Sequence, residues 1–223
     1  MSTIAIIGAG MMGSAMSVPA ADNRHTVRLV GTPLDRSIIE EAKRSGYHNT
    51  LKRKLPCGVS CYYAEEADAA IDGCDLIIGG VSSFGVEWFL ENVLTRLDGK
   101  IPVLSITKGL HMLPDGRMIP FPEYYHSRLG SGRLSLNCVG GPCISFELAD
   151  RKHTEVAFCG AVIEDVLKIK EMLATDYYHI TATTDVRGIE SAVAMKNAYA
   201  LGVSLAVGMA EAERGEGCPE DYN

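Results

Sequence analysis

Short apolar runs alternate with helix-like segments along most of this chain of 223 residues. The apolar runs predict strands over residues 4–7, 26–30, 59–63, 75–79, 101–105, 136–139, 154–159 and 177–180, the last at a sheet edge. The segments between them predict helices over residues 65–71, 84–97, 121–128 and 161–173, and the second of these should bury Phe84, Trp88, Val93 and Leu97. Strands that alternate with helices indicate crossover connections. The predicted fold class is therefore α/β, with a doubly wound, mainly parallel sheet.

The last apolar segment, residues 189–210, predicts a buried helix that carries a single positive charge. At helical spacing Lys196 lies in the middle of an otherwise apolar stripe. Burial of an unpaired charge is costly, so we expect this lysine to be paired, to be neutral, or to point into a cavity where it meets a substrate. Glu190 and Asn197 favour a site on the same helix. The alternative is that the Lys196 stem lies along the helix and its ammonium group reaches solvent.

The first predicted strand leads directly into a glycine-rich turn. Gly8, Gly10 and Gly13 have the spacing GxGxxG, and the residues that follow are small and compatible with a helix. In a dinucleotide-binding motif the first glycine allows the tight turn, the second lets the backbone approach the pyrophosphate, and the third lets helix and strand pack closely. Free N–H groups at the helix N-terminus then meet the phosphates. This order favours nucleotide binding over a purely structural turn.

The end of the second predicted strand bears on the choice between NAD and NADP. An acidic residue there would hold the ribose 2′-hydroxyl of NAD. This strand instead runs into Gly31, Thr32 and Pro33, and the nearest acid, Asp35, lies beyond the expected position. Thr32 can bond a phosphate or a hydroxyl, and Arg36 is near enough to pair with a 2′-phosphate. The balance favours NADP, with two alternatives: Asp35 could turn back toward the ribose, and Arg36 could be a solvated charge.

Two further loops place polar groups at the ends of predicted strands. Lys108 follows the strand over residues 101–105, at the carboxyl end of a central strand, where open α/β sheets bind ligands. A second glycine turn, Gly140-Gly141-Pro142-Cys143, follows the strand over residues 136–139. Backbone N–H groups in such a turn can approach an anionic or carbonyl ligand, and a structural turn is the competing explanation. Cys143 is expected to line the same site.

Composition and charge restrict the partners and the compartment. The net charge is −7 and the longest basic run has three residues, so nucleic acid is not an expected partner. Apart from the helix that carries Lys196, no apolar stretch is long enough to span a membrane, and the immediate first strand leaves no room for a signal peptide. The seven cysteines form no CxxC pair, which predicts reduced thiols and no metal site. We expect a cytoplasmic protein.

Four motifs in a fixed order resemble the NAD(P)-dependent glycerol-3-phosphate dehydrogenase family. They are Gly8 to Gly13, Ser105-Ile106-Thr107-Lys108-Gly109, Gly141-Pro142 with Glu147-Leu148-Ala149, and Gly188-Ile189-Glu190 leading to Lys196-Asn197. The similarity runs from residue 2 to about residue 208. The resemblance implies a Rossmann-like domain and reversible hydride transfer between NAD(P)H and dihydroxyacetone phosphate. The product would be sn-glycerol 3-phosphate, which feeds glycerophospholipid synthesis.

The resemblance also implies a role for each site residue. Lys196 would protonate the carbonyl oxygen during reduction, Lys108 would hold that oxygen and the cofactor by charge, and Asn197 would orient the reacting groups. Gly141 and Cys143 would contact the substrate. The cofactor would be lined by Gly8, Gly10, Met11, Met12, Gly13, Thr32, Lys108 and Ser145. Two ammonium groups suit an oxygen that becomes negative, and their mutual repulsion would lower the pKa of one of them.

The sequence departs from the family pattern in two places. Cys143 stands where serine or threonine is usual, which weakens one hydrogen bond to the substrate and adds an oxidisable thiol. The family continues past residue 223 into a helical domain that helps to grip the substrate phosphate. Residues 1–185 are therefore expected to form the dinucleotide-binding domain, and residues 186–223 the first helix of an incomplete all-α domain. Since an apolar helix must be covered, we expect a truncated chain or a homo-oligomer in which a second subunit covers it.

Two other function classes stay open on the sequence. One is a related reductase of the same architecture that acts on ketopantoate or a β-hydroxyacid, although the Thr107-Lys108-Gly109 element speaks against it. The other is an NAD(P)-binding module without turnover, which the missing phosphate grip would explain.

Overall fold

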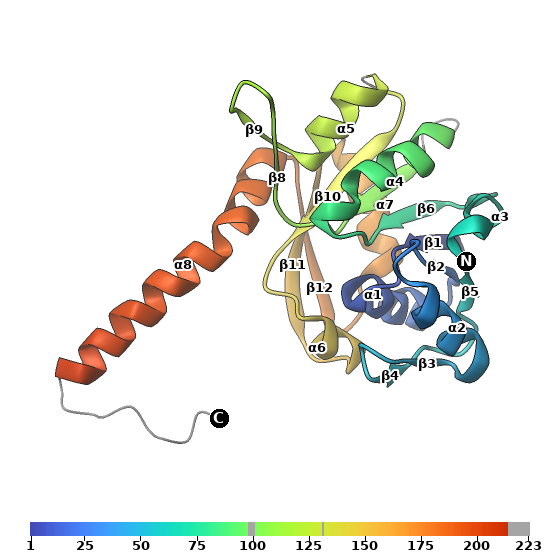
Figure 1. The fold of residues 1–223 in the computed structure, drawn as a ribbon, viewed down its shortest axis with the longest axis horizontal. Helices are drawn as coiled ribbons and strands as arrows, with labels where there is room; N and C mark the ends of the chain where they lie inside the picture. Colours follow the sequence, from blue (N-terminus) through green and yellow to red (C-terminus); the bar gives the residue numbers. More distant parts are fainter. Residues whose placement is uncertain (98–100, 131, 214–223) are drawn as a thin grey trace.

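Eight strands form one sheet at the centre of the protein (Figure 1). The computed structural model describes residues 1–97, 101–130 and 132–213. The strand order is β12-β11-β10-β7-β6-β1-β2-β5. In that order the strands are Tyr178–Thr183, Thr154–Gly160, Ser135–Gly140, Pro102–Ser105, Leu76–Gly79, Thr3–Ile7, Thr26–Val30 and Ser60–Tyr62. All neighbours pair in parallel except β10 and β11, so the prediction of a mainly parallel sheet is confirmed.

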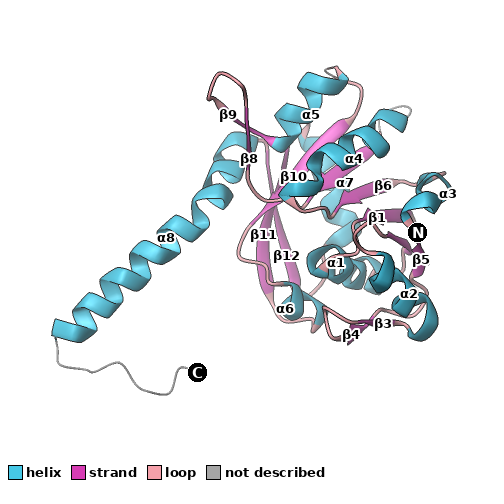
Figure 2. Ribbon diagram, in the orientation of Figure 1, coloured by secondary structure: helices cyan, strands magenta, loops and turns pink. Residues whose placement is uncertain are grey.

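The two faces of the sheet enter two separate cores, because successive side chains of a strand point to opposite faces. Ile4 and Ile6 of β1 belong to one core, whereas Ala5 and Ile7 belong to the other. The first core is covered by α1 (Met11–Asp22), α2 (Arg36–Ser45), α6 (Ser145–Ala149) and α7 (Ile163–Leu173). The second is covered by α3 (Ala67–Ile71), α4 (Val86–Asn92) and α5 (Phe121–Leu129) (Figure 2). Helices on both faces complete a doubly wound fold.

The hydrophobic pattern located every strand of this sheet, with bounds that differ by a few residues. The predicted edge strand is β12, which lies at the end of the strand order. The pattern missed two small hairpins, formed by β3 (Tyr47–His48) with β4 (Arg53–Lys54) and by β8 (Leu110–Met112) with β9 (Met118–Pro120). Strands of two or three residues are too short to show an alternation of apolar and polar positions.

The helix predicted over residues 84–97 is broken into three pieces. Its pieces are the 3-10 turns Ser83–Gly85 and Leu94–Arg96 on either side of α4. Val93 and Leu97 are buried as predicted, and Trp88 is half-buried. Phe84 is 97% exposed, so its predicted burial was wrong. Phe84 precedes the first residue of α4, and the helical periodicity that placed it on the buried stripe does not apply to a 3-10 turn.

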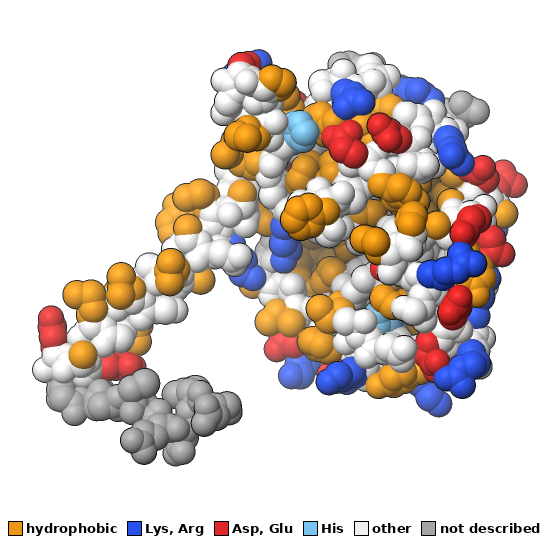
Figure 3. Space-filling view, in the orientation of Figure 1, with side chains coloured by type: hydrophobic (Ala, Val, Ile, Leu, Met, Phe, Trp, Pro, Cys, Tyr) orange, Lys and Arg blue, Asp and Glu red, His pale blue; other side chains and the backbone are white. Residues whose placement is uncertain are grey.

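The last helix, α8 (Val186–Glu213), projects away from the sheet, and the space-filling view shows hydrophobic side chains along it (Figures 1 and 3). Of the residues of α8, Glu190 alone is buried, and Lys196 is exposed. The prediction of a buried helix around Lys196 was therefore wrong for the part of the chain that the structure describes. Only the first part of α8 packs on β10 and β11, and beyond it apolar side chains are more than half exposed, among them Leu201, Val203, Leu205 and Met209.

By length and composition α8 could also cross a membrane, with a mean hydropathy of 1.3 over its most apolar window. A core helix of a protein outside the membrane passes the same test. The criterion therefore assigns no location to this helix.

Candidate active site

A groove of about 310 Å³ runs along the carboxyl ends of β1, β2 and β6. The residues that line it include Gly8, Gly10, Thr32, Asp35, Phe84 and Trp88. The carboxyl ends of parallel strands are where open α/β sheets bind ligands. The groove therefore lies where the GxGxxG spacing predicts a dinucleotide. Phe84 and Trp88 are lining residues that the sequence assigned to the core instead.

The glycine turn between β1 and α1 shapes this groove. Gly8 has a φ of +111°, and a Cβ on it would lie 2.6 Å from the carbonyl oxygen of Gly80. A Cβ on Gly13 would lie 2.1 Å from the carbonyl oxygen of Gly8, so α1 can pack this closely only on a glycine. A Cβ on Gly10 would meet no atom within 4 Å. A side chain at position 10 would therefore occupy the groove itself.

Asp35 bonds the glycine turn itself, whereas the sequence alternative had it turn back toward the ribose. Its Oδ2 accepts hydrogen bonds from the Ala9 N–H at 3.2 Å, the Thr32 N–H at 2.8 Å and the Thr32 hydroxyl at 2.7 Å. Three donors therefore share one carboxylate oxygen. Asp35 thereby fixes the end of β2 against the turn, and the hydroxyl proton of Thr32 is already used inside the protein.

Arg36 lies in a side hollow of about 90 Å³ that adjoins the groove at Thr32 and Pro33. Its Nη1 donates to Oε1 of Glu65 at 2.8 Å, and its guanidinium lies 5.1 Å from the centre of the Tyr63 ring. Arg36 is thus an exposed charge that is paired with Glu65. Its ion pair with Glu65 is exposed, and such pairs contribute little to stability. The guanidinium can therefore exchange this partner for a bound anion.

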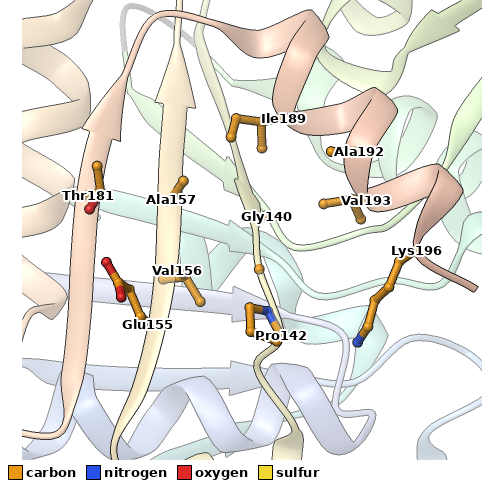
Figure 4. A pocket seen from close by; sticks show the side chains of 11 residues that line it. Gly140, Pro142, Glu155, Val156, Ala157, Thr181, Ile189, Ala192, Val193 and Lys196 are labelled. Atoms are coloured by element: carbon orange, nitrogen blue, oxygen red, sulfur yellow. The ribbon is translucent and has the colours of Figure 1, made fainter. Parts of the chain in front are cut away.

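A larger cavity of about 490 Å³ lies between β10, β11, β12 and the start of α8 (Figure 4). Its lining includes Gly140, Gly141, Val156, Thr181, Val193 and Lys196. A Cβ on Gly140 would lie 2.5 Å from Cγ2 of Ile189, so this glycine lets α8 approach β10. Gly141 has a φ of +140°, and a Cβ there would lie 3.0 Å from the carbonyl oxygen of Glu155. The two glycines therefore allow close contact of the turn with α8 on one side and with β11 on the other.

Lys196 lines this cavity, and Lys108 and Cys143 lie near enough for its charge to act on both of them. Lys196 extends from α8 toward the turn that holds Pro142 (Figure 4). Partial burial lowers the pKa of Lys108, and the positive charge of Lys196 lowers it further. Burial raises the pKa of the Cys143 thiol, although a hydrogen bond with Thr154 and the two lysines act in the opposite direction. Cys143 is therefore a neutral thiol within the field of both lysines.

This arrangement suits a ligand whose oxygen gains negative charge. Two cations beside that oxygen would stabilise the charge, and either could supply a proton. The hydrogen bond from the Thr107 hydroxyl to the Val81 carbonyl oxygen, 2.8 Å long, connects the loop of Lys108 to the dinucleotide groove, which Val81 lines. Lys108 therefore stands where the groove and the lysine-containing cavity approach each other.

The remaining predicted site residues are less directly placed. Met11 is exposed in the first turn of α1, whereas Met12 is half-buried and packs against the core of that face. Ser145 begins α6, which packs against α1. Asn197 is exposed on α8 and does not line the cavity beside Lys196. The structure brings Lys108, Lys196 and Cys143 together and leaves Asn197 outside that group.

Glu190 is the polar residue whose environment the sequence did not predict. It is 1% exposed, and neither carboxyl oxygen has a hydrogen-bond partner among the described residues. Burial raises its pKa to about 7, which the nearby Cys138 thiol offsets only in part. The Sγ atoms of Cys138 and Cys159 lie 3.2 Å apart on directly opposite positions of β10 and β11. A carboxyl group that stays protonated up to about pH 7 is therefore packed between α8 and a pair of free thiols.

Comparison with known proteins gives a family match. A profile described as the NAD-dependent glycerol-3-phosphate dehydrogenase N-terminus matches residues 3–163. A relative from Archaeoglobus fulgidus, named NADP(+)-dependent glycerol-3-phosphate dehydrogenase, is 33% identical over 201 residues, which are 90% of this chain and 59% of that protein. A relative from an Exiguobacterium species, named glycerol-3-phosphate dehydrogenase [NAD(P)+], is 26% identical and covers 94% of this chain and 60% of its own length.

Solved structures with a similar fold include a glycerol-3-phosphate dehydrogenase. The crystal structure of glycerol-3-phosphate dehydrogenase from Coxiella burnetii matches with a TM-score of 0.77 at 24% identity, over 88% of this chain and 58% of that one. At this identity the likeness concerns the fold. The chain spans about three fifths of the length of the curated relatives named above. The comparisons do not favour the ketopantoate- or β-hydroxyacid-type reductase, nor the module without turnover.

Proposed function

Because the chain belongs to the NAD-dependent glycerol-3-phosphate dehydrogenase family, we propose that it carries out the reversible reduction of dihydroxyacetone phosphate to sn-glycerol 3-phosphate. The observation that carries this proposal is the position of Lys196 in one cavity with the glycine turn Gly140-Gly141-Pro142, near enough to Lys108 for its charge to lower the pKa of Lys108. The Lys108 loop is hydrogen-bonded to the wall of the dinucleotide groove, so that the same loop borders both sites.

The groove at Gly8, Gly10 and Thr32 would hold NAD(P)H, a hydride donor. Lys196 would donate the proton to the substrate oxygen, and would remove it in the reverse direction. Lys108 would stabilise the negative charge on that oxygen, and its position next to the groove lets it act on both ligands.

The other predicted residues have supporting roles in this proposal. Gly141 and Cys143 would contact the substrate from the second glycine turn, and the neutral thiol would do so as a weak hydrogen-bond donor. Met11, Met12 and Ser145 would line the cofactor path from α1 and α6. Asn197 is exposed one residue after Lys196 and would orient the reacting groups.

We propose NADP as the preferred cofactor. Arg36 lines the side hollow beyond Thr32, where a 2′-phosphate would meet its guanidinium. Asp35 already accepts three hydrogen bonds at Oδ2, so it is partly withdrawn from a ribose hydroxyl. The Archaeoglobus fulgidus relative is named as NADP(+)-dependent. Titration with NADPH and NADH tests this preference directly.

We also propose the wider organisation of the protein. Residues 1–185 form the dinucleotide-binding domain and residues 186–223 begin a helical domain, of which residues 214–223 lie outside the described part. The exposed apolar side chains of α8 would be covered by further helices or by a second copy in a homo-oligomer. We place the enzyme in the cytoplasm, where its product would serve glycerophospholipid synthesis.

The decisive experiment follows the absorbance of NADPH, with NADH in parallel, when the protein is mixed with dihydroxyacetone phosphate. The proposal expects oxidation of the cofactor, a loss of turnover of about a hundredfold or more in Lys196→Ala, and unchanged NADPH binding in that variant. Lys168→Ala, which removes an exposed lysine of α7, is the matched control. Binding of NADPH without oxidation would instead indicate a cofactor-binding module, and full activity in Lys196→Ala would remove Lys196 from the chemistry.

A further inference from the structure

The side hollow beside the dinucleotide groove contains one cation and one anion that face the same small space. Arg36 and Glu65 both line it, together with Thr32, Pro33 and Tyr63. Strand pairing fixes this geometry, because the Gly31 N–H donates to the Tyr62 carbonyl oxygen at 2.9 Å. The end of β2, which borders the groove, is thereby tied to the end of β5, and the 3-10 turn Ala64–Glu66, which contains Glu65, follows β5 directly.

The neighbouring charges, Lys43 and Glu66, pair with each other. The Arg36–Glu65 pair is the one that lines the hollow. Lys43 lies 4.0 Å from the centre of the Tyr63 ring, and its Nζ donates to Oε2 of Glu66 at 2.8 Å. The same Glu66 oxygen accepts the Tyr63 N–H at 2.8 Å, so this second pair also holds the backbone. Lys43 and Glu66 do not line the hollow.

The ion pair between Arg36 and Glu65 is weak enough to break, and the Glu65 carboxylate stays ionised when it does. The two side chains are 60% and 68% exposed, and exposed pairs contribute little to stability. A hydrogen bond from its own backbone and the Arg36 guanidinium hold the pKa of Glu65 below its usual range. A phosphate that takes over Arg36 therefore meets a carboxylate in the same space, whereas a ribose hydroxyl carries no charge for it to repel.

We propose that Glu65 is a specificity-determining residue for the dinucleotide: it occupies Arg36 in the free protein and repels a 2′-phosphate, and so limits the preference for NADPH over NADH. This inference rests on the proposed function, because it assumes that a dinucleotide binds in the adjoining groove. Arg36 attracts the phosphate and Glu65 opposes it, so the preference reflects the difference between the two effects.

The test compares dissociation constants of NADPH and NADH, measured by titration of cofactor fluorescence with the whole protein. Glu65→Gln should bind NADPH about threefold to fivefold more tightly, while the affinity for NADH changes less than about twofold. Glu40→Gln is the matched control, because Glu40 pairs with Arg36 at 3.6 Å but does not line the hollow. In the control both affinities should stay within about twofold of the wild type.

Salt provides a second measurement that a merely structural role would not change. The gain for NADPH in Glu65→Gln should shrink between low salt and about 0.5 M salt, since exposed charges are screened there. An equal change for both cofactors, no change for either, or a gain that salt leaves intact would overturn the role of Glu65. If neither cofactor binds to the wild type or to any variant, the proposed function fails as well, so the two failures are distinguishable.

Discussion

Glu190 gives the most direct test of the structure, because it predicts how the stability of the protein depends on pH. Its carboxyl group is 1% exposed, and burial raises its pKa from 4.5 to about 7. In the unfolded chain the same carboxyl ionises near pH 4.5. Between these two values folding requires Glu190 to take up a proton, so the folded state becomes less stable as the pH rises through this interval.

The magnitude follows from the separation of the two pKa values. Each pH unit is worth about 1.36 kcal/mol, so the interval from 4.5 to about 7 corresponds to about 3 kcal/mol of stability. Below pH 4.5 both states are protonated and nothing is lost; above about pH 7 both are ionised and the loss is complete. The Glu190→Gln variant has nearly the same shape but cannot ionise. Its free energy of unfolding relative to the wild type should therefore rise by about 3 kcal/mol between pH 4.5 and pH 8.

Urea denaturation of the wild type and Glu190→Gln at pH 5, 6, 7 and 8 measures this difference. Glu171→Gln, which removes an exposed carboxylate of α7, is the control and should show no comparable change relative to the wild type. A constant difference between Glu190→Gln and the wild type over the whole pH range would refute the argument, because it would mean that the buried carboxyl is not neutral in the folded protein. A steeper dependence in the variant than in the wild type would refute it as well.

Four further substitutions test the groove, the packing of α1 and the packing of α8 separately. Gly10→Val should fold normally and bind NADPH at least about tenfold more weakly, since its side chain enters the groove. Gly13→Ala should instead lose about 1–3 kcal/mol of stability, because its Cβ would lie 2.1 Å from a backbone oxygen. Urea denaturation and NADPH titration of each variant check both expectations. Phe84→Ala should weaken NADPH binding without a lower thermal midpoint, because the ring lines the groove and is 97% exposed; a large loss of stability would contradict this placement. Gly140→Ala should lower turnover and stability together, since its Cβ would lie 2.5 Å from Ile189 and push α8 off the sheet, and normal activity would show that the helix tolerates the shift.

The sequence predicted the sheet and the glycine turn because both leave local patterns. Each strand is a short apolar run, and the order strand, GxGxxG, helix is contained in one continuous segment. The environment of Glu190 depends instead on Cys138 of β10 and Cys159 of β11. The hydrophobic pattern could not show that these two strands form an antiparallel pair. Phe84 shows the same limit. Its spacing in the sequence fits the apolar positions of the following helix, although it lies in the 3-10 turn before that helix.

The spacing of residues in the sequence could not predict that Lys108 and Lys196 lie near each other. Each lysine stood out by its local setting, one after a central strand and one on an apolar helix. Their approach depends on how β7 and α8 are arranged around β10, which is a tertiary property. The exposure of α8 could not be predicted for a related reason, since burial of an apolar helix depends on which other segments are available to cover it.

The reversal of direction between β10 and β11 divides the edge of the sheet into two parts. Gly140 at the end of β10 pairs with Ala157, and β11 runs parallel with β12. The cavity beside Lys196 is lined by the end of β10 together with β11 and β12, whereas the dinucleotide groove is formed at the ends of β1, β2 and β6. Replacement of side chains on β11 and β12 would change the lining of this cavity and leave the turn from Gly8 to Gly13 untouched. In such an architecture the lining of the cavity and the lining of the groove can change separately during evolution, and each can be engineered on its own.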